Sequence, residues 1–426
     1  MSFVPAGHAG RNGGERVKIL LLTWACDRDD VSEPAIAYRW VREIANRHEV
    51  VLFAVSRPDR FGCVREQFPD LVVHEWRDIW APRCLERFRA VVKPGYFFYF
   101  RKARKFVRNL VHQDDFNLIH HLNPFAWRYP SPAYGLGLPL VRGPLAGGLP
   151  TPAPMRGEIS EALHPYKFLR FTDAWRKKWD WRLNNAYRHT DCILAAAPYV
   201  LDLLKPLPVK RSAIEIEHGL TIQQSRRTRP EKGGVNNKVE LLFVGRLIRT
   251  KGVRDAIRAV AKMETRTQVR FTIIGDGEDM EACRTLVTSL GLGELVEFRG
   301  WCVKEAVEAA YDQADIFLFP SFREPTGGVL LEAMAHSLPC VTCDYGGPAY
   351  MVAEGCGFKV PPAEPERFAL LLAKHLDVLV NDPTMRQAMA QSAQGHAIQN
   401  FDWSKKMARI DALYRSLSRM QLCEIQ

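Results

Sequence analysis

Short apolar strand candidates alternate with stretches of helical patterning along almost the whole chain. Strands that alternate with helices predict parallel sheets covered by helices on both faces. The candidates in the first half are residues 17–23, 49–55, 70–76, 117–123, 191–197 and 213–219. Those in the second half are residues 239–245, 269–275, 295–300, 315–320 and 338–343. We therefore expect an α/β protein with two doubly wound, Rossmann-like domains.

A polar segment separates the two sets of strand candidates. Residues 221–238 are charged and contain Pro and Gly, which is typical of a linker. A chain of 426 residues is also too long for one typical domain. The expected parts are a loose tail (1–16), a first domain (17–220), the linker, a second domain (239–400) and a C-terminal helix that returns to the first domain (401–426). A cleft between two such sheets is a natural ligand site.

Composition narrows the possible partners and compartments. No run of about 18 apolar residues occurs, so we expect no membrane-spanning segment, and the opening residues lack the pattern of a signal peptide. The ten cysteines are scattered, which favours free thiols in a reducing cytoplasm. Cys340 and Cys343 have the spacing of metal ligands, but no second pair accompanies them. The net charge of +11 favours an anionic partner, such as a nucleotide phosphate, a phospholipid surface or nucleic acid.

The stretch "FREPTGGVLLEAMA", residues 322–335, has a glycine pair between two carboxylates. It follows a buried strand candidate and continues as an apolar helix, so Gly327 and Gly328 should lie at the first N–H groups of that helix. Such a helix start attracts a phosphate. Glu324 and Glu332 on either side suit the hydroxyl groups of a nucleotide sugar. The alternative is a buried helix with one solvated and one capping glutamate.

Two further turns follow strand candidates in the second half. Gly245 ends one strand, and Arg246 and Lys251 follow it in one loop, where two cations suit a diphosphate. Solvated loop charges are the plain alternative. Gly300 and Trp301 end another strand before a helix, in a turn that suits backbone contacts to a nucleotide base.

Taken together and in this order, these segments resemble the retaining glycosyltransferases of family 4, which have the GT-B fold. The resemblance covers about residues 239–360 and is carried by "GRLIRTKG", "IIGDGE", "FRGW", "FLFPSFREPTGGVLLEAMAHSLPCV" and "YGGP". It implies that Arg246 and Lys251 hold the donor diphosphate and that the glycine pair gives its amides to the β-phosphate. It also implies that Glu324 lies beside the donor sugar and that Glu332 holds the ribose hydroxyls.

The first half matches that family less closely, and "TWACDRDD" stands where the family has a glycine-rich loop. The resemblance implies a histidine at the end of the strand candidate 117–123 that contacts the donor sugar. Because successive strand residues face opposite sides, only one of His120 and His121 should enter the site, and packing roles are the alternative. Gly147 and Gly148 offer amides toward an acceptor or a phosphate, or simply form a tight turn.

Two stretches of the first half, residues 87–111 and 166–189, mix Arg and Lys with aromatic residues. Such stretches suit an anionic membrane interface or single-stranded nucleic acid, and ordinary amphipathic helices are the plain alternative. Because many relatives in the resembling family act on lipid-linked acceptors, we expect a membrane surface and no nucleic acid.

The function that we expect is transfer of a hexose from a UDP- or GDP-linked donor to a glycan or lipid-linked acceptor, with retention of anomeric configuration. No cofactor or metal is expected, since cations and helix amides would stabilise the leaving diphosphate. The expected location is the cytoplasm, peripheral to the membrane. The alternatives are a sugar-nucleotide 2-epimerase of the same fold and a non-catalytic membrane or nucleic-acid binding protein.

Overall fold

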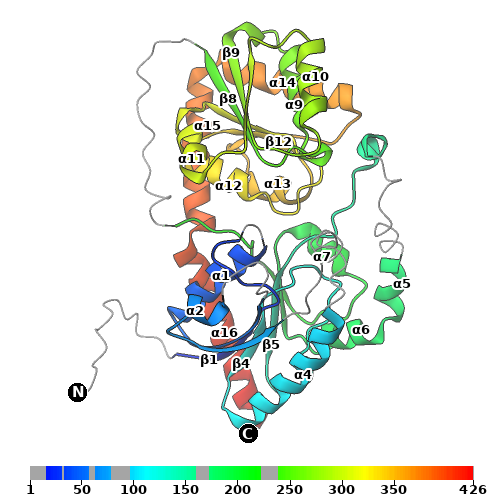
Figure 1. Ribbon diagram of the computed structural model, residues 1–426, viewed down its shortest axis with the longest axis vertical. Coiled ribbons are helices and arrows are strands. Elements are labelled where there is room, and N and C mark those ends of the chain that lie inside the picture. Colours follow the sequence, from blue (N-terminus) through cyan, green and yellow to red (C-terminus); the bar gives the residue numbers. More distant parts are fainter. Residues whose placement is uncertain are drawn as a thin grey trace, which may run out of the picture.

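The computed structural model of the chain describes residues 16–30, 33–56, 63–77, 96–159, 172–221 and 238–425 (Figure 1). Of the predicted tail only Arg16 lies among these residues. Of the predicted linker only Thr221 and Lys238 do.

The described part of the first half contains one sheet of seven parallel strands. Its order is β3-β2-β1-β4-β5-β6-β7, so the order reverses between β1 and β4. The strands are β1 (Lys18–Leu22), β2 (Glu49–Ser56), β3 (Val72–Arg77), β4 (Leu118–His121), β5 (Leu140–Leu145), β6 (Cys192–Ala195) and β7 (Ser212–Ile214).

The described part of the second half contains one sheet of six parallel strands. Its order is β10-β9-β8-β11-β12-β13, with the reversal between β8 and β11. The strands are β8 (Val239–Val244), β9 (Val269–Ile274), β10 (Val296–Gly300), β11 (Ile316–Phe319), β12 (Cys340–Cys343) and β13 (Gly357–Val360). In sheets of this kind a ligand binds outside the carboxyl ends of the strands at the reversal.

Helices cover both sheets. Those of the first half are α1 (Glu33–Ala45), α2 (Val64–Gln67), α4 (Tyr96–Gln113), α5 (Thr172–Trp179), α6 (Trp181–Arg188) and α7 (Pro198–Leu204). Those of the second half are α9 (Val253–Lys262), α10 (Met280–Ser289), α11 (Lys304–Gln313), α12 (Gly328–Ala335), α13 (Gly346–Met351), α14 (Pro365–Asn381) and α15 (Pro383–Phe401). The last helix is α16 (Trp403–Ile425).

Strand alternation builds the core of the first half on two faces of its sheet. Ile19 and Leu21 of β1 pack into one cluster with α1, whereas Leu20 and Leu22 pack into the other with α4. Successive side chains of a strand point to opposite faces, so both faces of this apolar strand are buried.

Helix α16 joins the second half to the first sheet, and Figure 1 shows α15 and α16 running from the upper half of the molecule to the lower. Trp403, Met407 and Tyr414 of α16 are buried in the same cluster as Ile19 of β1. No helix in the described ranges is both long and apolar enough to cross a membrane.

Two strands were not among the predicted ones. Strand β5 contains Gly143 and Pro144, residues that local patterns place outside strands. Position 143 has room only for glycine, because the backbone of β6 approaches so closely that a Cβ atom there would lie 2.3 Å from the carbonyl oxygen of Leu194. Strand β13 begins at Gly357, where the backbone of β12 is equally close: a Cβ atom on Gly357 would lie 2.0 Å from the carbonyl oxygen of Cys340.

Candidate functional site

The carboxyl ends of the two sheets face each other, and loops from both halves meet there. The loop after β11 reaches the segment after β7, where the Thr326 hydroxyl donates to Oε1 of Glu217 at 2.9 Å. The same loop reaches the segment after β5, where the Arg323 guanidinium donates to the Thr151 hydroxyl at 3.2 Å. The predicted site residues of the second half lie at this junction.

The glycine pair lies at the start of α12, as the sequence pattern predicts. Gly327 is the N-cap with φ of 88°, a left-handed conformation that favours glycine, and Gly328 is the first helical residue. The N–H of Leu330 donates back to the carbonyl of Gly327 at 2.9 Å. The remaining first-turn N–H groups and the positive end of the helix dipole face the junction, an arrangement that suits an anion.

Lys251 and Glu324 meet beside this helix start. Lys251 lies in the loop after β8, and Glu324 lies in the loop after β11, the neighbouring strand. The ammonium and the carboxylate form an ion pair. Glu324 is 7% exposed, so the sheet order brings a nearly buried carboxylate and a cation from different loops to one point.

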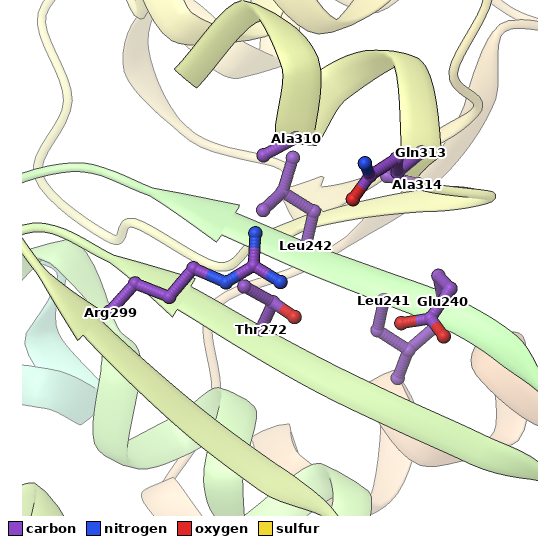
Figure 2. Close-up of a pocket in the computed structure, with 8 residues that line it drawn as sticks. All are labelled: Glu240, Leu241, Leu242, Thr272, Arg299, Ala310, Gln313 and Ala314. Carbon is purple, nitrogen blue, oxygen red and sulfur yellow. The ribbon is translucent and has the colours of Figure 1, made fainter. Parts of the chain in front are cut away.

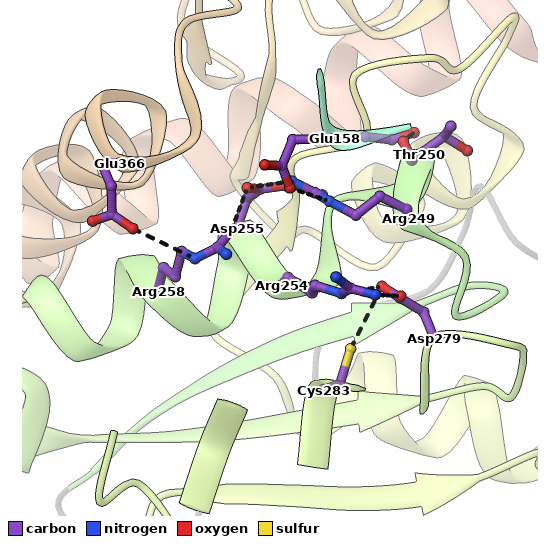
Figure 3. Close-up of polar contacts among 10 residues, drawn as sticks. Glu158, Arg249, Thr250, Arg254, Asp255, Arg258, Asp279, Cys283 and Glu366 are labelled. Atoms are coloured by element: carbon purple, nitrogen blue, oxygen red, sulfur yellow. Dashed lines mark hydrogen bonds and ion pairs between the residues drawn. The ribbon is translucent and has the colours of Figure 1, made fainter. Parts of the chain in front are cut away.

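A network of ion pairs holds the loop that carries Lys251, as Figure 3 shows. Arg249 donates to Glu158 at 2.8 Å and to the fully buried Asp255 at 2.5 Å. Arg254 pairs with Asp279 on the next loop of the sheet, at 3.0 Å through its Nε. Because Glu158 belongs to the first half, this network also ties the loop across the junction.

Arg246 lies in the same loop but is exposed, and its side chain has no hydrogen-bond or ion-pair partner among the described residues. Its neighbour Gly245 follows β8 directly, and a Cβ atom on Gly275 would lie 1.9 Å from the carbonyl oxygen of Gly245. The loops after β8 and β9 therefore touch backbone to backbone. This contact fixes where the chain leaves β8 and leaves the Arg246 side chain in solvent.

Glu332 lies one helical turn beyond the glycine pair, and its side chain is exposed. The Tyr311 hydroxyl donates to its Oε2 at 3.1 Å, which orients the carboxylate. Gly300 ends β10 in a left-handed conformation, with φ of 67°, and its carbonyl accepts from the N–H of Gly275 at 2.7 Å. Trp301 follows it and is 75% exposed.

The structure separates the two histidines of β4. His120 is fully buried, with Nδ1 at 2.6 Å from the Tyr414 hydroxyl of α16 and Nε2 at 2.7 Å from the carbonyl oxygen of Gly143. Burial lowers the pKa of His120 to about 4. Both ring nitrogens are therefore used within the fold, and His120 holds α16 against the sheet.

His121 points to the other face of the same sheet. It is 1% exposed, and neither ring nitrogen has a hydrogen-bond partner in the described ranges. Burial, and then the neighbouring Arg142, lower its pKa well below the usual value. Of the two histidines, only His121 has nitrogens left for a further partner.

Gly147 and Gly148 follow β5 and both have left-handed backbone, with φ of 77° and 74°. A Cβ atom on Gly148 would lie 2.9 Å from Nε1 of Trp127, whereas nothing surrounds Gly147 within 4 Å. The turn that they form directs the next residues to the second half, where the Tyr345 hydroxyl donates to the carbonyl oxygen of Pro150 at 3.2 Å.

Two residues of the junction were not predicted as site residues. Glu217 and His218 follow β7, in a segment that the sequence pattern assigned to a strand over residues 213–219, whereas the strand ends at Ile214. The His218 ring lies against Gly328, so that a Cβ atom there would be 2.8 Å from its Cε1. The available signal was a Glu-His pair at the end of the last strand candidate of the first half.

Burial dominates the electrostatics of this pair. It raises the pKa of Glu217 to about 7, and Oε2 of this side chain has no hydrogen-bond partner among the described residues. It lowers the pKa of His218 to about 4, and the nearby cations Lys406 and Lys251 act in the same direction. A neutral imidazole and a readily protonated carboxyl group therefore lie beside the start of α12.

Lys406 of α16 clamps the backbone of this segment. Its ammonium is fully buried and donates to the carbonyl oxygens of Ile216, at 2.5 Å, and His218. The rings of Trp40 and Trp403 lie 5.1 and 4.5 Å from it. The helix that crosses between the halves therefore sets the position of Glu217 and His218.

A small cavity lies elsewhere in the second half (Figure 2). It has about 20 Å³ and is lined by residues of β8, β9, β10 and α11, among them Glu240, Thr272, Arg299 and Gln313. That volume suits a single water molecule. The described ranges contain no group of three His, Cys, Asp or Glu side chains arranged to hold a metal ion.

Sequence comparison relates the second half to known enzymes. Residues 224–396 match the family model of glycosyl transferases group 1. The chain is similar to a lipopolysaccharide core biosynthesis glycosyltransferase of Rhizobium meliloti (strain 1021), at 27% identity over 217 residues, 49% of this chain and 59% of that protein. The chain thus spans about half the length of the curated relatives it matches.

Structural comparison extends over nearly the whole chain. Sucrose-phosphate synthase from Thermosynechococcus elongatus aligns with 94% of this chain and 99% of its own, at a TM-score of 0.65 and 18% identity. Anabaena HepE in complex with UDP-glucose aligns with 94% and 100%, at 0.59 and 19%. At these identities the likeness concerns the fold, and it confirms the predicted GT-B arrangement of two Rossmann-like domains. By sequence, the comparisons relate residues 224–396 to the group 1 glycosyl transferases.

Proposed function

We propose that this protein is a glycosyltransferase that moves a hexose from a nucleotide-diphosphate donor to a glycan or lipid-linked acceptor, with retention of anomeric configuration. The observation that carries the proposal is the Lys251–Glu324 ion pair beside the glycine pair of α12, at a junction between two facing sheets. The match of residues 224–396 to glycosyl transferases supports it independently.

The donor diphosphate lies, in this proposal, at the start of α12. The amides of Gly327 and Gly328 bind its β-phosphate, and Lys251 and Arg246 supply the positive charge. Glu332 accepts hydrogen bonds from the ribose hydroxyls, and Gly300 and Trp301 lie where the base would be held. The donor is UDP- or GDP-linked, and the UDP-glucose complex of Anabaena HepE, which shares the fold, supports UDP.

In the reaction, the bond from the anomeric carbon to the β-phosphate oxygen breaks and a bond to the acceptor oxygen forms on the same face. The acceptor hydroxyl gives its proton to the leaving phosphate. Charge develops on that phosphate, so fixed donors and cations placed around it lower the barrier. Glu324 stabilises the positive charge that develops on the sugar, and His121 contacts the sugar from the first half. Because Lys251, Arg246 and α12 provide positive charge, we propose that no metal ion takes part.

The acceptor is proposed to be lipid-linked, with the enzyme peripheral to the cytoplasmic face of an anionic membrane. The name of the Rhizobium relative, which acts in lipopolysaccharide core biosynthesis, supports a cell-surface glycan. The described cysteines are all unpaired, in keeping with a reducing compartment.

Calorimetric titration with UDP, GDP and ADP tests the donor site directly. We expect one of the first two nucleotides to bind, and binding to survive EDTA. Replacement Lys251→Ala should weaken it, whereas Lys262→Ala should not, because Lys262 lies on the outside of α9 and pairs with Glu366. Absence of binding by all three nucleotides would overturn the proposal. A strict requirement for Mg²⁺ or Mn²⁺ would overturn its metal-free part.

A further inference from the structure

Helix α5 has the reverse of the usual amphipathic arrangement. Its polar side chains bind the protein: Arg128 pairs with Asp173, Arg176 donates to the carbonyl oxygen of Arg128 at 2.8 Å, and Lys177 donates to the carbonyl oxygen of Leu203 at 2.6 Å. Asp173, Arg176 and Lys177 fall on one face of a helix. No described side chain of α5 is buried. Charged contacts, and not an apolar core, therefore hold this helix in place.

The opposite face of α5 carries tryptophan. Trp175 and Trp179 lie one turn apart and are 61% and 62% exposed. Trp181 at the start of α6 is also 62% exposed, although the same helix buries Leu183 and Tyr187. The three indoles thus stand on the surface while their helices are fixed from behind. We call Trp175, Trp179 and Trp181 the tryptophan face.

Basic groups border the tryptophan face. The Lys178 ammonium lies 5.1 Å from the Trp179 ring, and the Arg182 guanidinium lies 5.4 Å from the Trp181 ring. Helix α4 also contains the exposed Arg101, Lys102 and Lys105 and no acidic residue, but the Lys102 ammonium lies 5.4 Å from the Trp76 ring of β3 and not beside the tryptophan face.

Helices α4 and α6 are joined through one tyrosine. The Arg104 guanidinium of α4 lies 4.2 Å from the Tyr134 ring, and the centroid of that ring lies 6.1 Å from that of His189, the C-cap of α6. Arg104 also donates to the carbonyl oxygens of Pro132 and Tyr134, so it serves the fold. Figure 1 shows α4, α5 and α6 on the lower half of the molecule, away from the second sheet.

We propose that the tryptophan face, with Lys178 and Arg182 beside it, is the surface by which the protein lies on an anionic lipid bilayer. Indole rings favour the headgroup region, where the ring is buried and the N–H stays hydrated. Basic side chains beside them add attraction to anionic lipid. The inference deepens the membrane part of the proposed function and is independent of the transfer reaction.

Geometry favours a bilayer over single-stranded nucleic acid. Proteins that stack bases on aromatic rings do so along a positively charged groove that follows the strand. Here the three rings are 61–62% exposed on two consecutive short helices, α5 and α6, and α5 has no buried side chain. A flat, extended partner with an apolar interior matches such a surface, and a lipid bilayer has both properties.

The test is co-sedimentation of the full chain with vesicles of phosphatidylcholine, with and without phosphatidylglycerol, in the absence of nucleotide. We expect binding to vesicles that contain phosphatidylglycerol, with part of it retained at high salt, because burial of indole is not screened. The triple replacement Trp175→Ser, Trp179→Ser and Trp181→Ser should weaken binding by at least about tenfold, since each ring buries roughly 150–250 Å². Quenching of tryptophan fluorescence by brominated lipid should be lost in the same variant.

The matched control is the double replacement Leu370→Ser and Val378→Ser on α14. These two residues are 44% and 41% exposed, respectively. It should bind vesicles like the unaltered protein. Affinity for UDP should be equal in all three proteins, so a missing nucleotide site and a missing membrane surface give different results. Equal sedimentation of the unaltered and triple-variant proteins would overturn the proposal. So would tryptophan-dependent binding of single-stranded RNA without vesicle binding.

Discussion

The Lys251 ammonium and the Glu324 carboxylate form an ion pair that joins the loop after β8 to the loop after β11. In the proposed function, the same ammonium binds the donor diphosphate. The donor and Glu324 therefore compete for one cation, or share it. Removal of Lys251 should therefore lower the affinity for the nucleotide, whereas neutralising Glu324 should not.

Lys251→Ala should reduce the affinity for UDP by roughly 10- to 100-fold, because a charge-assisted hydrogen bond is worth about 1.5–3 kcal/mol. The nearly buried Glu324 then lacks its partner and repels the phosphate as well. Glu324→Gln should leave UDP affinity equal or higher, because Lys251 is released, but should slow the release of UDP from a UDP-sugar. Calorimetry and a UDP-release assay give both quantities. A fall in UDP affinity in Glu324→Gln would contradict the competition.

His120 and His121 form a matched pair for a second prediction. His120→Phe leaves the Tyr414 hydroxyl and the carbonyl oxygen of Gly143 without their partner, and each buried unpaired group costs about 1–3 kcal/mol. Denaturant unfolding should show that loss of stability. His121→Phe removes nitrogens that have no partner in the described ranges, so stability should change little, while UDP release from a UDP-sugar slows. The reverse order of stabilities would show that the two histidines have been assigned to the wrong roles.

Those two histidines also show what local sequence leaves open. Alternation within a strand predicts that they face opposite sides, and they do. The choice between them depends on Tyr414, which lies 294 residues further along the chain. The start of α12 was predictable because strand, glycine pair and apolar helix follow one another within residues 315–335.

Glu217 and His218 illustrate the opposite case. The pattern of residues 213–219 favours a continuous strand, and the structure ends that strand at Ile214. Lys406 draws the following backbone out of the sheet by binding the carbonyl oxygen of Ile216, 190 residues earlier in the chain. Because the two residues are so far apart in the sequence, the local pattern of residues 213–219 cannot predict this contact.

Glu217 gives a prediction for pH. Its pKa is raised from 4.5 to about 7, mainly by burial, which corresponds to about 3 kcal/mol. A raised pKa means that this group stabilises the fold fully below about pH 4.5 and that the contribution is lost as pH rises through about 7. Glu217→Gln can still accept from Thr326 and stays neutral. The variant should therefore gain stability over the unaltered protein, by up to about 3 kcal/mol, as pH rises across this window.

The measurement is urea unfolding of both proteins across that pH range. Lys406 also titrates near this region, because burial lowers its pKa to about 7, but it is present in both proteins. Because Glu217 raises the pKa of Lys406, the replacement lowers that pKa as well, and the difference reports the coupled pair. A difference that is constant with pH would show that Glu217 has an ordinary pKa in the folded protein.

Gly328→Ala tests whether the contact of His218 with α12 matters for the nucleotide. The backbone of Gly328 needs no left-handed φ, and the three atoms nearest the new methyl group would all belong to the His218 ring, 2.8–3.0 Å away. The ring must therefore shift, and it lies beside the helix start where the β-phosphate is proposed to bind. We expect UDP affinity to fall by about tenfold with stability reduced by only about 1 kcal/mol. The control is Gly395→Ala in α15, where nothing lies within 4 Å; it should raise stability by up to about 1 kcal/mol and leave UDP affinity unchanged. If Gly328→Ala bound UDP as tightly as Gly395→Ala, the phosphate site would not lie at the start of α12.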